Sequence, residues 1–139
     1  MKPNQKQLVQ QTWAQVAPIA DTAADLFYGR LFELDPALRP LFARADMAAQ
    51  KKMLMQTLGL IVKGLDMTDQ LIPALENLGR RHADYGVRDE HFATVGEALL
   101  WTLGKGLGPA FTPQVKDAWT AAFGVVAAVM QGAMKQKAA

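Results

Sequence analysis

Three leucines and a histidine recur at helical spacing near the middle of the chain. Leu71, Leu75, Leu78 and His82 lie at successive intervals of four, three and four residues, which puts all four on one face of a helix. We expect a histidine on such an apolar face to point toward the core. Because a buried imidazole is costly without a partner, His82 must be hydrogen-bonded within the protein or bound to a ligand.

The remainder of the chain also has the pattern of helices. Asp35 and Thr112 each precede a proline, which combines a capping side chain with a residue that suits the first helical position. Further candidate caps are Asn4, Asp46, Asp69 and Asp89. Seven helical segments are predicted, over residues 5–17, 20–34, 36–42, 47–65, 70–84, 90–107 and 113–135. No pair of segments predicts a β-hairpin, so the expected fold class is all-α.

Length and composition narrow the class of protein. The chain has 139 residues, which suits a single domain over 1–139 with room for a core and one ligand. Half of the residues are hydrophobic and none is cysteine, which excludes disulfides, zinc–cysteine sites and iron–sulfur clusters. The net charge is +2 and the basic residues are scattered along the chain, which argues against a nucleic-acid partner.

The longest uncharged segment covers residues 118–134 and contains Thr120 and Gln131. It falls short of the roughly 20 predominantly apolar residues that span a bilayer, so we interpret it as a buried helix and expect no membrane insertion. Residues 1–15 mix lysine, glutamine and asparagine without an apolar run, unlike a secretory signal peptide. A cytoplasmic location is therefore expected.

Apolar faces recur in the longer predicted helices, and one of them begins with a polar residue. In 47–65 the face comprises Gln50, Leu54, Thr57, Leu58, Ile61 and Leu65. The corresponding faces elsewhere include Ala24, Phe27, Tyr28, Leu31, Phe32, Phe92, Val95, Leu99, Leu103, Trp119, Phe123, Val126 and Met130. Such faces by themselves indicate only a helical core. For His82, which lies on such an apolar face, a haem iron is a natural partner in an all-helical chain.

The order and spacing of the unusual residues resemble those of the globin family. Tyr28 lies in the second helix, Phe42 ends the third, Gln50 and Leu54 stand one turn apart, and His82 follows 32 residues after Gln50. The resemblance is closest to bacterial single-domain globins and to the haem domain of flavohaemoglobins, and it extends from Trp13 to about Met130. It is carried by Leu26-Phe-Tyr-Gly-Arg-Leu-Phe32, Leu78-Gly-Arg-Arg-His-Ala-Asp-Tyr-Gly-Val87, His91-Phe-Ala-Thr-Val-Gly96 and Ala118-Trp-Thr-Ala-Ala-Phe-Gly124.

The resemblance implies a globin fold of about seven helices around haem b. It makes His82 the iron ligand, Phe42 the aromatic residue that wedges the porphyrin, and Tyr28 and Gln50 the two donors toward a bound gas. Leu54 would crowd the gas site, and Leu58 and Ile61 would help to keep water out. The remaining pocket residues that it implies are Leu78, Arg81, Val87, Phe92, Val95 and Phe123. Arg81 is expected either to reach a haem propionate or to remain solvated.

Four positions depart from the pattern of the resembled group. Flavohaemoglobin-like proteins often support the iron-ligating histidine with tyrosine and glutamate, whereas the matching positions here are Phe92, Phe123 and Met134. We therefore expect a backbone carbonyl near Leu78 to support His82, which argues against peroxidase-like chemistry. Lys51 stands where the group commonly has proline after its glutamine, which predicts a different start to that helix.

The resemblance leaves several functions open. The leading expectation is reversible binding of O2, CO and NO, in transport or storage of oxygen. One alternative is a nitric oxide dioxygenase supplied with electrons by a separate reductase, because the chain has no Gly-rich nucleotide-binding motif. The others are a haem-based gas sensor and a haem-free helical interaction module. His91 lies in a polar helix start, and we expect it to be exposed and not to bind iron.

Overall fold

Helices make up nearly all of residues 1–138, the part of the chain that the computed structural model describes. The α-helices are α1 (Pro3–Val16), α2 (Ala20–Leu34), α3 (Met47–Gly64), α4 (Thr68–Asp84), α5 (Asp89–Leu107) and α6 (Pro113–Ala138). Short 3-10 helices are η1 (Ala17–Ile19), η2 (Pro36–Phe42) and η3 (Gly108–Ala110). The described residues contain no strand, so the predicted all-α class is confirmed. The predicted helix 36–42 is the 3-10 helix η2 rather than an α-helix.

Three of the predicted capping side chains hold helix starts. Asp46 begins α3, where its Oδ1 accepts hydrogen bonds from the backbone N–H groups of Ala48 and Ala49 at 3.1 and 3.4 Å. Asp35 accepts from the second residue of η2 at 3.1 Å, and the Thr112 hydroxyl accepts from the third residue of α6 at 3.2 Å. These side chains satisfy N–H groups that lack a partner in the first turn.

The other three predicted caps lie inside the first turns instead. α1 begins at Pro3, one residue before Asn4, because the ring of proline suits the first helical position. Asp69 and Asp89 lie in the first turns of α4 and α5, where a carboxylate interacts favourably with the helix dipole.

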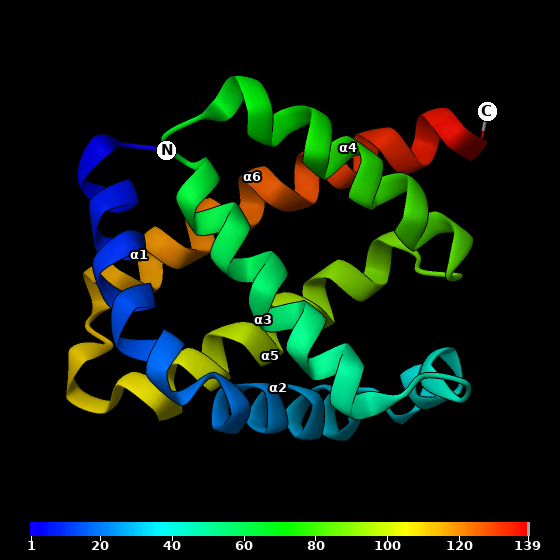
Figure 1. The fold of residues 1–139 in the computed structure, drawn as a ribbon, viewed down its shortest axis with the longest axis horizontal. Coiled ribbons are helices and arrows are strands. Elements are labelled where there is room, and N and C mark those ends of the chain that lie inside the picture. The colour runs from blue at the N-terminus through cyan, green and yellow to red at the C-terminus, as the bar shows by residue number, and fades with distance from the viewer. Residues whose placement is uncertain (139) are drawn as a thin grey trace.

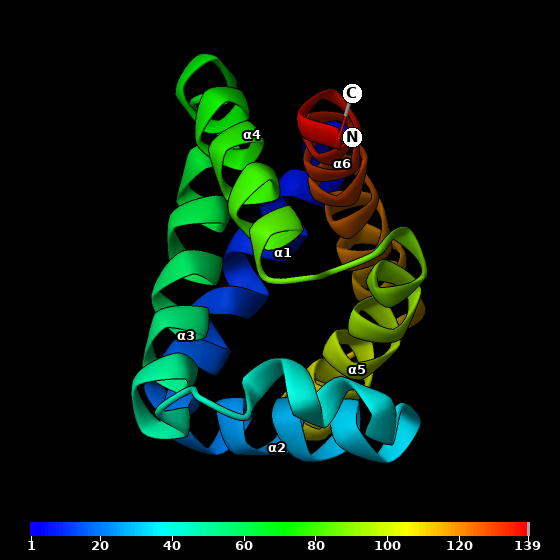
Figure 2. The ribbon, with the colours of Figure 1, turned by 90° about the vertical axis from the view of Figure 1, so that its right-hand side faces the viewer.

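α3 and α4 lie on one side of the molecule, and α5 and α6 lie on the other (Figure 2). α4 packs across α6, α1 packs against α6, and α2 runs along the lower edge against α5 (Figure 1). η2 continues from the end of α2 and leads into α3 (Figure 2). This arrangement makes α2, α3, α4 and α5 face a common interior.

Two close helix approaches depend on glycine. A Cβ atom at Gly79 would lie 2.5 Å from the carbonyl oxygen of Met130, so α4 and α6 touch backbone to backbone one turn before His82. A Cβ atom at Gly96 would lie 2.9 Å from the ring of Phe123. These distances are too short for any side chain larger than hydrogen, and the glycines therefore set how closely the helices around the interior pack.

A buried polar contact joins the two ends of the sequence. The indole N–H of Trp119 in α6 donates to the hydroxyl oxygen of Thr12 in α1 at 2.9 Å, and that hydroxyl donates to the carbonyl oxygen of Leu8 at 2.7 Å. Both side chains are buried, and the Thr12 hydroxyl supplies the acceptor that the buried indole N–H of Trp119 requires. Among residues 1–138, none of the helices combines the length and apolar character needed to cross a membrane.

Candidate functional site

The imidazole of His82 is held by its own helix. Its Nδ1 lies 2.8 Å from the carbonyl oxygen of Leu78, one turn earlier in α4. A carbonyl oxygen can only accept, so Nδ1 carries the proton and Nε2 keeps its lone pair for a ligand. Burial lowers the pKa of the imidazole below its ordinary value, and the Leu78 carbonyl opposes this by a smaller amount. The ring is therefore neutral, as metal ligation requires.

Across the interior, α2 and α3 bring a phenol and an amide together. The Nε2 of Gln50 donates a hydrogen bond to the hydroxyl oxygen of Tyr28 at 3.2 Å. Tyr28 is only 4% exposed, and this burial raises the pKa of its phenol, while the bond from Gln50 lowers it by less. Tyr28 is therefore a protonated donor at neutral pH, and Gln50 has a second amide hydrogen to donate.

Aromatic rings surround the Tyr28 side chain. Phe42, at the end of η2, meets the Tyr28 ring edge-on with 5.6 Å between centroids and the Phe32 ring at 5.5 Å. Phe27 makes a second edge-on contact with Tyr28, at 5.1 Å between centroids. Edge-to-face packing is a favoured arrangement of aromatic rings, so this cluster fixes the orientation of the phenol.

A single cavity of about 610 Å³ connects these groups. All the pocket residues predicted from the sequence line it: Tyr28, Phe42, Gln50, Leu54, Leu58, Ile61, Leu78, Arg81, His82, Val87, Phe92, Val95 and Phe123. They come from α2, η2, α3, α4, α5, α6 and the α4–α5 connection. The structure thus brings together residues almost 100 positions apart in the sequence. Of these, Arg81 is exposed.

The sequence pattern missed several lining residues. Leu41, Met53 and Tyr85 line the cavity although they are 39%, 58% and 59% exposed, so they form part of its mouth. Spacing could have identified two of them. Met53 lies three residues after Gln50, and Tyr85 lies three residues after His82, which is about one helical turn in each case. Trp119 and Val9 line the cavity from α6 and α1, where they had the appearance of ordinary core.

The second histidine differs from its prediction. His91 is half-buried and lines the cavity, so the expectation of a solvent-exposed side chain is wrong. Its Nδ1 accepts a hydrogen bond from the backbone N–H of Arg88 at 3.0 Å, and the imidazole thus caps α5. The polar sequence around His91 misled the prediction, because a helix start can be polar while its side chain folds back over the helix end.

The expected departures around His82 are visible in the structure. The carbonyl of Leu78 is the hydrogen-bond partner of the imidazole, as predicted. Phe92 and Met134 are buried apolar side chains, and neither can donate or accept a strong hydrogen bond. The nearest aromatic contact of His82 is Tyr85, whose ring centroid lies 5.7 Å away.

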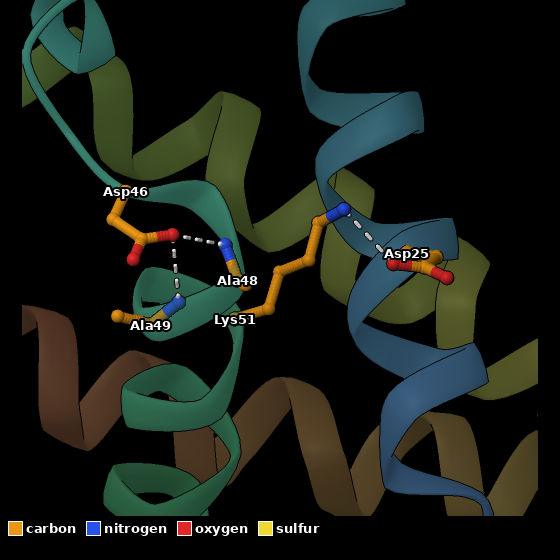
Figure 3. Close-up of polar contacts among 5 residues, drawn as sticks. All are labelled: Asp25, Asp46, Ala48, Ala49 and Lys51. Atoms are coloured by element: carbon orange, nitrogen blue, oxygen red, sulfur yellow. Dashed lines mark hydrogen bonds and ion pairs between the residues drawn. The ribbon is translucent and has the colours of Figure 1, made fainter.

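Lys51 does not disturb the start of α3. The helix begins regularly at Met47 after its cap Asp46, and Lys51 reaches across to α2, where its Nζ lies 2.9 Å from Oδ1 of Asp25 (Figure 3). The expectation that this helix start differs from that of the resembled group stays a prediction. The difference lies in the contact that a lysine makes and a proline could not.

Comparison with known proteins agrees with this arrangement. A neuroglobin of Danio rerio is 32% identical over 90% of this chain and 87% of its own length. A flavohemoprotein of Bordetella parapertussis is 31% identical over 95% of this chain. The chain spans about a third of the length of the flavohemoproteins that it matches.

Two solved structures share the fold. An engineered carbene transferase, whose parent is assigned as a nitric oxide dioxygenase of Rhodothermus marinus, superposes with a TM-score of 0.88 at 24% identity over 98% of this chain and 94% of its own. A hexacoordinated haem protein from an anhydrobiotic tardigrade gives a TM-score of 0.85 at 16% identity over 97% and 96%. The predicted globin fold is thus confirmed. The globin family model matches residues 25–130, and this chain belongs to the globin family.

Proposed function

We propose that the chain holds haem b in this cavity and binds oxygen and other diatomic gases reversibly. The observation that carries the proposal is the pairing of one neutral histidine with a phenol and an amide around a single cavity. An iron atom held by a macrocycle needs only one protein ligand on one side, and His82 supplies such a nitrogen. When bound, the haem would supply an iron atom with a free position for a small gas.

Each residue of the cavity then has a separate role. His82 Nε2 would be the nitrogen that holds the haem iron, and the Leu78 carbonyl fixes the orientation of the ring by accepting from Nδ1. The Tyr28 hydroxyl and the second amide hydrogen of Gln50 are donors for a small polar ligand. Leu54, Leu58 and Ile61 line the cavity with apolar surface that disfavours water, which supports a ferrous state.

The spectrum of the purified protein tests the proposal. We expect one haem per chain, a histidine-type Soret band for the reduced protein under carbon monoxide, and loss of haem in His82→Ala. The stability of His82→Ala is measured alongside, because a merely structural histidine would change stability and leave haem uptake intact. A chain that refuses added haemin would overturn the proposal and favour a haem-free interaction module.

A second candidate is nitric oxide dioxygenation, with electrons from a separate reductase. It is favoured by the flavohemoprotein relatives and by the assignment of the Rhodothermus marinus protein. The two functions differ in turnover. A dioxygenase consumes nitric oxide continuously and yields nitrate when a reductant is supplied, whereas a carrier stops after one equivalent per haem. A gas sensor would instead require a partner protein that responds to the ligand state.

A further inference from the structure

An ion pair lies directly beside the phenol–amide pair of the cavity. Lys51 Nζ in α3 lies 2.9 Å from Asp25 Oδ1 in α2, and the side chains are 33% and 67% exposed (Figure 3). Lys51 is the position at which the sequence departs from the pattern that the resemblance implies.

The two pairs connect neighbouring parts of the same two helices. Lys51 is the neighbour of Gln50 in α3, and Asp25 lies three residues before Tyr28 in α2, one helical turn away. Among residues 1–138, the hydrogen bonds and ion pairs that join α2 to α3 are these two contacts. A movement of this part of α3 relative to α2 would therefore alter both contacts.

The far end of α3 is fastened in a different way. Just after the helix, the carboxylate of Asp66 forms an ion pair with Lys6 at 3.0 Å and accepts a hydrogen bond from Gln10 at 2.9 Å. Both partners lie in α1. Gly64 lies against the buried side chain of Leu71 in α4.

The first turn of α3 has fewer outside contacts. The side chain of its cap, Asp46, bonds only to Ala48 and Ala49 of the same helix, and both alanines are exposed (Figure 3). A cap stabilises the helix but does not attach it to a neighbour. Met47 of this turn is partly buried against the core, and the polar contacts that join the start of α3 to α2 are those of Gln50 and Lys51.

We propose that Lys51 and Asp25 are positioning residues, whose ion pair holds the first turn of α3 against α2 and keeps the Gln50 amide within reach of the Tyr28 hydroxyl. The effect on gas binding rests on the proposed function, whereas the effect on α3 does not. An exposed ion pair shifts the equilibrium between the attached and the detached first turn by about two- to fivefold, which corresponds to about 0.4 to 1 kcal/mol. The same exposure makes the pair sensitive to salt.

Amide hydrogen exchange tests the attachment of the helix without any gas signal. In the full chain as purified, we expect Lys51→Met to speed exchange over residues 47–53 by about two- to fivefold at low salt. Lys6→Met is the matched control, because it removes an ion pair of similar length and exposure at the other end of α3. It should leave residues 47–53 unchanged. The exchanged pair Asp25→Lys with Lys51→Asp should restore slow exchange.

Oxygen dissociation by stopped flow tests the consequence in the haem-loaded chain. The wild type should release oxygen about two- to fivefold faster in high salt than in low salt, and Lys51→Met should be fast at both. Lys6→Met should retain the salt response of the wild type. Unchanged exchange in Lys51→Met, or the same change in Lys6→Met, would overturn the positioning role. A chain that binds no haem would refute the proposed function, and the exchange measurement would still decide the role of Lys51.

Discussion

The amide nitrogen of Gln50 donates to the hydroxyl oxygen of Tyr28 at 3.2 Å, which couples α2 and α3 at the lining of the cavity. Because the phenol oxygen accepts this bond, its own proton remains available to a ligand in the cavity. Gln50 thus has two roles, one through its remaining amide hydrogen and one through the orientation of Tyr28. The two residues form one donor unit, and we do not expect their substitutions to be additive.

Tyr28→Phe and Gln50→Leu should each speed oxygen dissociation and autoxidation in the haem-loaded protein. A hydrogen bond to a partly charged ligand contributes about 1 to 3 kcal/mol, which corresponds to a change of about 5- to 150-fold. The double variant should dissociate oxygen more slowly than the product of the two effects predicts. Stopped-flow mixing with carbon monoxide measures the rates, and unchanged rates in both single variants would refute the assignment of these donors.

The burial of Tyr28 predicts an alkaline loss of stability. The pKa of its phenol is raised above the unfolded value of about 10 by desolvation, with a smaller opposing effect from Gln50. Because the folded state holds this proton more tightly, the stability contribution is complete below pH 10 and is lost as pH rises through the folded pKa. Urea unfolding between pH 8 and pH 11 should therefore show a steeper decline in the wild type than in Tyr28→Phe. Parallel declines would contradict the raised pKa.

Gly79→Ala should destabilise the protein. The added Cβ would lie 2.5 Å from the carbonyl oxygen of Met130, so the α4 and α6 backbones must separate at the turn that precedes His82. Such overpacking costs about 1 to 3 kcal/mol in free energy of unfolding. Gly29→Ala is the control, because nothing lies within 4 Å of its added Cβ and alanine is the better helix former by about 1 kcal/mol. Equal effects of the two substitutions would show that the α4–α6 crossing is not close.

Thr12→Val tests the buried contact between α1 and α6. The substitution keeps the side-chain shape but leaves the indole N–H of Trp119 without its acceptor. An unsatisfied buried donor costs about 1 to 3 kcal/mol, which chemical denaturation can measure. Thr120→Val is the matched control. Like the hydroxyl of Thr12, that of Thr120 donates to a backbone carbonyl of its own helix, but it lies at the surface. We expect the control to change stability by less than about 0.5 kcal/mol.

Local chemistry was sufficient to predict most of the helices. The apolar spacing of α2 and the cap at Asp46 appear within a few residues of sequence, and the structure follows both. The face that begins with Gln50 lines the cavity, as does His82, because helical periodicity alone decides which side chains share a face. The predicted limits of the first helix, 5–17, differ from those of α1, and the prediction of a helix over 36–42 did not include its 3-10 character. Caps and proline compete at helix ends, and small energy differences decide there.

The sequence by itself determined the helical faces and the residue types available to the site, because both depend on neighbours within one or two turns. Only the tertiary structure decided how those faces meet. It placed His91 against the cavity, made Leu41 part of the mouth, and paired Lys51 with Asp25. These relations depend on the crossing of helices, which close contacts such as that of Gly79 with Met130 determine. Packing between distant segments has no periodicity in the sequence, and so its outcome appears only in three dimensions.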